Sequence, residues 1–100
     1  MKAKAGLIIK EIEDEYILVD SGIETPKFNG MIKLNDSSKF IIEALMKEDL
    51  TIDELVDKMF EHYDATKEEL KEGILPVIEQ LKEIKIIRYK GKTNVKFLYI

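Results

Sequence analysis

Residues 31–36, Met-Ile-Lys-Leu-Asn-Asp, constrain the fold of this chain more than any other segment. They join a short apolar strand to polar residues that open a helix, so they separate a β-rich beginning from a helical middle. The strand has no obvious later partner in the sequence, and an unpaired strand edge is a template for pairing with another chain. We therefore expect the specific function of this protein at that edge.

Two runs of β-branched and apolar residues precede this strand, at residues 7–9 and 16–19. The acidic stretch 13–15 between them is predicted to form the turn of a hairpin. A glycine then opens the short strand over residues 30–34. The sequence therefore predicts an N-terminal three-stranded antiparallel sheet.

Three amphipathic helices are predicted after this strand. Asp36 or Ser37 is expected to cap the first helix, and Thr51 and Thr66 each begin a Thr-x-x-Glu capping box. The third helix is predicted to continue through Pro76 with a kink, because its apolar stripe keeps its phase there. The predicted stripes are Phe40, Ile41, Ala44 and Leu45 in the first helix, Ile52, Leu55, Val56, Met59, Phe60 and Tyr63 in the second, and Leu70, Ile74, Val77, Ile78, Leu81 and Ile84 in the third.

The end of the chain is β-rich and basic. Alternating residues around Gly91 predict a second hairpin over residues 86–100. The net charge of the chain is −4, yet five basic residues and no acidic one follow residue 84. This tail either is a solvated hairpin or steers the protein toward nucleic acid or an acidic peptide. The predicted fold class is α+β: a three-stranded antiparallel sheet, three helices and a C-terminal hairpin.

The composition excludes several classes of function. One hundred residues with 45% hydrophobic content fit a single globular domain. No apolar run is long enough to span a membrane, and the absence of cysteine excludes disulfides and thiolate metal sites. His62 is the only histidine, so it has no second imidazole for a metal site. We therefore expect a cytoplasmic protein without catalytic residues, metal or cofactor.

The order of these segments resembles the PqqD family, the small peptide chaperones of pyrroloquinoline quinone biosynthesis. The resemblance rests on the hairpin, on Leu34-Asn35 at the end of the third strand, on the helix start at Thr51 and on Leu81 near the end of the last helix. Relatives of this family are peptide-recognition domains in pathways that modify ribosomally made peptides. The resemblance covers about residues 7–88.

Two positions depart from the family pattern. Lys85 stands where family members commonly have a glycine, near the exit of the last helix. The tail beyond Arg88 lies outside the pattern. We therefore divide the chain into a PqqD-like peptide-recognition domain, residues 1–88, and a basic β-rich extension, residues 89–100.

The resemblance implies a winged helix-turn-helix-like fold that has lost DNA binding. It also implies a function: the domain captures the leader segment of a precursor peptide by strand addition and presents it to a radical SAM-type maturase. The implied receiving strand is Met31, Ile32, Lys33 and Leu34. We expect the opposite wall of the site to consist of Leu75, Ile78 and Lys82 in the last helix.

Two alternatives remain open from the sequence. The first is a winged-helix DNA-binding regulator that uses the basic hairpin, residues 86–100, as its wing. Five glutamates in the last helix argue against it, because DNA phosphates demand basic partners. The second is an interaction domain whose residues 95–100 pair with the open strand. That pairing would either block the strand or exchange between the two copies of a homodimer.

Overall fold

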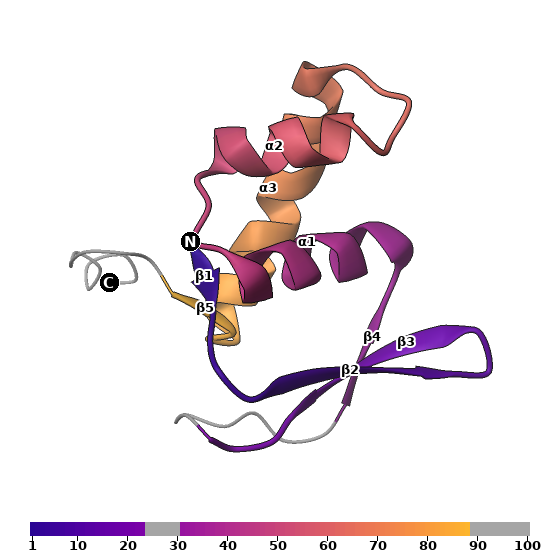
Figure 1. The fold of residues 1–100 in the computed structure, drawn as a ribbon, viewed down its shortest axis with the longest axis vertical. Coiled ribbons are helices and arrows are strands. Elements are labelled where there is room, and N and C mark those ends of the chain that lie inside the picture. The colour runs from indigo at the N-terminus through magenta and orange to yellow at the C-terminus, as the bar shows by residue number, and fades with distance from the viewer. Residues whose placement is uncertain (24–30, 89–100) are drawn as a thin grey trace.

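A computed structural model of the chain describes residues 1–23 and 31–88. Its elements follow in the order β1 (Lys2–Ala3), β2 (Leu7–Ile12), β3 (Glu15–Asp20), β4 (Met31–Leu34), α1 (Asp36–Lys47), α2 (Ile52–Phe60), α3 (Lys67–Glu83) and β5 (Ile87–Arg88). Strands β2, β3 and β4 form an antiparallel sheet that three helices follow, which confirms the predicted α+β fold. In the view of Figure 1, α1 lies between this sheet and α2.

The β2–β3 hairpin closes through a two-residue turn. Ile12 is the register partner of Glu15, so only Glu13 and Asp14 form the loop. Both have a positive φ, 50° and 68°, as the type I′ turn of a two-residue hairpin requires. The turn lies in the predicted acidic stretch, but Glu15 is the first residue of β3 and not part of the turn.

The helix starts follow the capping residues closely. Both predicted capping boxes form, at the start of α2 and at the start of α3. The cap of α1 is one residue earlier than predicted: Asn35, rather than Asp36 or Ser37, accepts the Ser38 N–H through its Oδ1 at 2.8 Å. Helix α3 continues through Pro76 to Glu83, as the unbroken phase of its stripe predicts.

One hydrophobic core joins the sheet to the helices. Leu18, at the centre of the sheet, is fully buried in a cluster that includes residues of all three helices. Ile42 of α1 is equally buried, although it is not in the predicted stripe. Because α1 lies between the sheet and α2 (Figure 1), it buries a wider face than a single stripe. Ile84 lies one residue beyond the end of α3 and is exposed, so the predicted stripe of that helix is one residue too long. In the predicted stripe of α2, Phe60 is exposed, whereas Tyr63 packs against the core from beyond the helix end.

Helix α3 ends in a Schellman motif. The Ile86 N–H donates to the Leu81 carbonyl at 2.9 Å, and the Lys85 N–H donates to the Lys82 carbonyl at 3.0 Å. This geometry places Lys85 in the left-handed region, with a φ of 62°, where glycine is the usual residue. The sequence position at which this chain departs from the PqqD pattern is therefore one at which the backbone favours glycine.

Replacing Lys85 with glycine is expected to raise the free energy of unfolding by about 1 kcal/mol, because glycine has no Cβ to strain in the left-handed region. Chemical denaturation of both proteins measures the difference. Lys85→Ala is the matched control, since it removes the same side chain but keeps the Cβ. Equal stabilisation by both substitutions would contradict a backbone origin of the effect.

The two ends of the described chain pair with each other. Strand β1 is not among the predicted strands; it pairs antiparallel with β5, with Ala3 opposite Ile87. The Lys4 N–H continues the contact by donating to the Ile86 carbonyl at 2.8 Å. Figure 1 shows β1 and β5 side by side. Of the C-terminal hairpin predicted over residues 86–100, only residues 86–88 are described. The extension from residue 89 and the pairing of residues 95–100 with the open strand lie outside the described residues.

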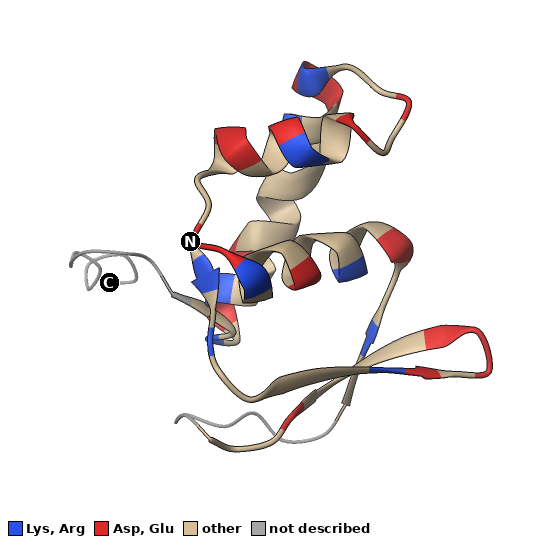
Figure 2. Cartoon of the chain, viewed as in Figure 1, with Lys and Arg blue, Asp and Glu red and all other residues tan. Residues whose placement is uncertain are grey.

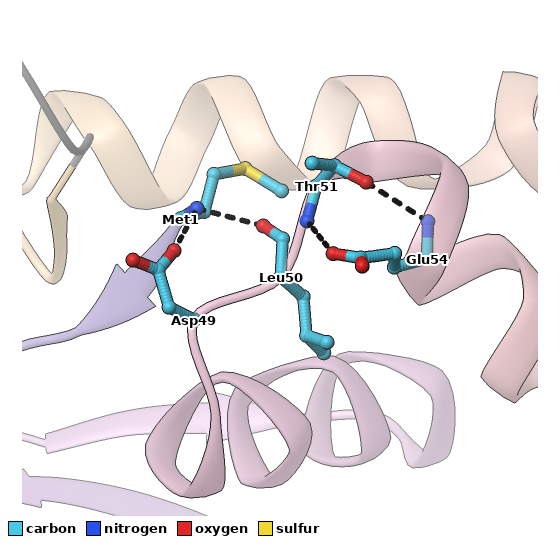
Figure 3. A network of polar contacts seen from close by, with 5 residues as sticks. All are labelled: Met1, Asp49, Leu50, Thr51 and Glu54. Carbon is cyan, nitrogen blue, oxygen red and sulfur yellow. Dashed lines mark hydrogen bonds and ion pairs between the residues drawn. The ribbon is translucent and has the colours of Figure 1, made fainter.

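Polar contacts tie β1 to the loop between α1 and α2 (Figure 3). The Met1 ammonium donates to Asp49 Oδ1 at 2.8 Å and to the Leu50 carbonyl at 2.7 Å. The Leu50 N–H donates back to the Met1 carbonyl at 2.8 Å. The capping box of Thr51 and Glu54 follows directly. This loop therefore positions both β1 and the start of α2.

Candidate functional site

Strand β4 is an edge strand of the sheet. It pairs with β3 from Val19 opposite Met31 to Tyr16 opposite Leu34. Within residues 1–23 and 31–88, β3 is the only strand that pairs with β4. An edge of this kind presents backbone N–H and C=O groups that an added strand can use. The four residues predicted to receive a peptide lie together on this edge.

The two faces of β4 have different surroundings, because successive side chains of a strand point to opposite faces. Leu34 is buried in the core, and Ile32 packs against the core on the same face. Met31 and Lys33 lie on the outer face, where Met31 is 71% exposed. A strand added to β4 would therefore meet apolar core residues on one face and exposed side chains on the other.

The outer face of the sheet carries a row of apolar residues that ends at the β4 edge. Ile8, Val19 and Met31 are register partners across the three strands. Ile8 and Met31 are exposed and Val19 is half-buried. Ile8 and Val19 are not among the predicted site residues, although the alternation of residues within each strand places them on the same face. This row extends the apolar surface of the sheet to the candidate edge.

Charged residues lie beside this apolar row. Lys33 Nζ and Glu15 Oε2 are 3.0 Å apart, and both side chains are more than half exposed. Lys33 is the register partner of Ile17, which in turn pairs with Lys10 on β2. Figure 2 shows acidic residues gathered at the tip of the β2–β3 hairpin and a basic residue on β4. The β4 edge thus combines one apolar and one cationic side chain on its outer face.

The three predicted wall residues of α3 share one stripe, because they are spaced i, i+3 and i+7. Their environments differ. Leu75 is 40% exposed, whereas Ile78 is 1% exposed and belongs to the same core as Leu34 of β4. Lys82 is partly exposed, and its Nζ lies 3.0 Å from Glu79 Oε2. Ile78 is thus a core residue, while Leu75 and Lys82 are the two predicted wall residues that reach the surface.

A second polar cluster lies near the start of α1. The Tyr63 hydroxyl donates to Asp36 Oδ2 at 3.3 Å, and burial together with this carboxylate raises the pKa of Tyr63. The hydrogen bond to Glu43 raises the pKa of Lys39, whose Nζ lies 4.7 Å from the centre of the Tyr16 ring. Both shifts move the pKa of the group further above neutral pH. Tyr63 therefore stays protonated and Lys39 stays charged at neutral pH.

The described residues, 1–23 and 31–88, contain no group of three or more His, Cys, Asp or Glu side chains arranged to hold a metal ion. None of their helices is long and apolar enough to cross a membrane.

Known proteins resemble the part of the chain that contains β4 and the three helices. A family model described as "Coenzyme PQQ synthesis protein D (PqqD)" matches residues 12–87. No curated protein matches the chain. A solved structure described as "TbiB1 in Complex with the TbiA(beta) Leader Peptide" matches with a TM-score of 0.67 and 16% sequence identity, covering 92% of this chain and 100% of that one. At this identity the likeness establishes a shared fold.

Proposed function

The chain belongs to the PqqD family, and from this membership we propose that it is a non-catalytic chaperone for the leader segment of a ribosomally made precursor peptide. The observation that carries the proposal is the edge strand β4, which pairs on one side only within the described residues. The leader segment would join the sheet there as a further strand. Backbone hydrogen bonds would supply affinity, and alternate side chains would supply specificity.

The structural neighbour supports a peptide as the partner. TbiB1 shares the fold of this chain and is in complex with a leader peptide. The receiving strand of the present chain would be Met31–Leu34. Leu75 and Lys82 would contact the peptide from α3, and Ile78 would support that wall from the core.

We propose that the chaperone acts in the cytoplasm and presents its peptide to a radical SAM-type maturase. The family resemblance supports this assignment. A gene for a radical enzyme with a Cys-x-x-x-Cys-x-x-Cys motif, beside a short precursor gene, would identify both partners.

Calorimetric titration tests the peptide-binding proposal. The leader half and the modified half of a precursor encoded beside this gene are titrated separately into the full chain. We expect saturable binding of the leader half alone, because a recognition domain of this type separates binding from modification. Absence of leader binding, or equal binding of both halves, would refute leader recognition.

A further inference from the structure

We propose that the outer face of β4 selects the side chains of its peptide, with an acidic residue opposite Lys33 and an apolar residue opposite Met31. This inference rests on the proposed function, because it assumes that a peptide strand joins the β4 edge. It adds the chemical pattern of that peptide. Read from its N-terminus, the strand would carry an apolar, an acidic and two further apolar residues.

The order of this pattern follows from the register of β4. The sheet is antiparallel throughout, and antiparallel pairing is slightly more stable per residue than parallel pairing. An antiparallel ligand strand runs from the position opposite Leu34 to the position opposite Met31. Its residues opposite Leu34 and Ile32 lie on the core-facing side, where both β4 side chains contact the core. These two positions therefore favour apolar residues.

The two outward positions differ from each other. Met31 ends the apolar row formed with Ile8 and Val19, and at 71% exposure it offers apolar surface to a neighbour. An apolar residue opposite Met31 would extend that row across a fourth strand. An acidic residue opposite Lys33 would lie on the strand next to β4, and the two strands would be about 5 Å apart. Opposite charges at such cross-strand positions are favourable and like charges are unfavourable.

The ion pair of Lys33 with Glu15 does not prevent this selection. Both side chains are largely exposed, at 67% and 52%, and such surface pairs are weak. Lys33 can therefore contact a ligand carboxylate while it remains near Glu15. Glu15 would, however, repel the ligand's acid, so Glu15→Gln is expected to tighten binding of an acidic peptide by about twofold.

Lys10 provides a matched control for charge reversal. It lies on the same face and in the same row as Lys33, but on β2 at the opposite side of the sheet. Three strand spacings, about 14 Å, separate it from a ligand strand on β4. This exceeds the screening length of about 8 Å at physiological ionic strength. Lys10→Glu thus makes the same change in net charge without placing it beside the peptide.

A display selection with a randomised ten-residue peptide library tests the proposal on the full chain. Peptides selected by the unmodified protein are expected to carry the apolar–acidic–apolar–apolar pattern. Selection by Lys33→Glu should replace the acidic residue with lysine or arginine. An acidic peptide from the first selection should bind Lys33→Glu about five- to tenfold more weakly, and Lys10→Glu with unchanged affinity.

The outcomes separate this inference from the proposed function. Strand-forming peptides without a charge preference at that position would overturn the role of Lys33 and leave peptide capture intact. Equal weakening by Lys33→Glu and Lys10→Glu would likewise overturn it, because a general charge effect would then suffice. If the unmodified protein selects no peptide, peptide capture itself is overturned together with this inference.

Discussion

Replacing Asp20 with alanine is expected to lower the free energy of unfolding by about 3–5 kcal/mol. Asp20 Oδ2 lies 2.8 Å from Lys4 Nζ, and the two side chains are 0% and 3% exposed. Its other oxygen, Oδ1, accepts the Gly22 N–H at 2.9 Å. The substitution would remove a carboxylate in direct contact with the buried Lys4 ammonium. Urea denaturation measures the loss.

Two further variants separate the charge from the shape of this ion pair. Asp20→Asn keeps an oxygen for Gly22 but removes the charge, so it should lose much of the same stability. The double substitution Lys4→Met with Asp20→Leu removes both charges and is expected to recover most of the loss, since a buried ion pair is often replaceable by apolar residues. A double variant as unstable as Asp20→Ala would contradict the electrostatic explanation.

Two leader peptides can be methylated on alternate backbone nitrogens, one in each of the two possible phases along the strand. Only one of these two peptides is expected to lose most of its binding. In a β-strand, alternate N–H groups point toward the neighbouring strand. If two methyl groups each remove a hydrogen bond of about 1 kcal/mol, the affinity falls roughly 30-fold. Titration calorimetry with the two methylated peptides measures the effect.

The peptide methylated in the other phase is the matched control. Its methyl groups replace the hydrogens of N–H groups that point to solvent. Its affinity should therefore remain within about twofold of that of the unmodified peptide. Equal loss in both phases would indicate steric exclusion rather than strand pairing. Equal retention in both phases would show that the peptide does not join the sheet through its backbone.

Local sequence patterns predict the elements that build the site. The capping boxes fix the starts of α2 and α3, because each supplies its own hydrogen-bond partners within four residues. The acidic stretch locates the turn between β2 and β3. The short open strand predicted over residues 30–34 is β4. Sequence alone does not identify the cap of α1, because Asn35, Asp36 and Ser37 can all cap a helix. The extended backbone at Asn35 makes that residue the cap.

Contacts between distant residues are what the sequence does not predict. Strand β1 has two residues, and its pairing with β5 joins positions more than 80 residues apart. The buried pair of Lys4 and Asp20 has no sequence signature, because either residue alone suggests a solvated surface. The exposure of Ile84 follows from the left-handed turn at Lys85, which ends α3 one residue before the predicted stripe does. These features depend on how the elements pack.

Part of the candidate site is likewise predictable from the sequence, and part depends on packing. The location of β4 at a sheet edge is predictable, because its sequence context offers one partner strand. The outer-face neighbours of Met31 and Lys33 depend on the register of β4 with β3, which the turn between β2 and β3 does not set. The greater burial of Ile78 than of Leu75 is predictable, because Ile78 belongs to the predicted apolar stripe of the third helix and Leu75 does not.

The central claim is that a peptide joins the edge of β4. It is tested most directly by amide NMR shifts of the ¹⁵N-labelled chain during titration with the leader half of the precursor. Peptide capture predicts shifts concentrated at Met31–Leu34 and at residues 75–82. Saturable leader binding that leaves the Met31–Leu34 amides unchanged would contradict the claim, and shifts confined to residues 85–96 on adding duplex DNA would favour a nucleic-acid function instead.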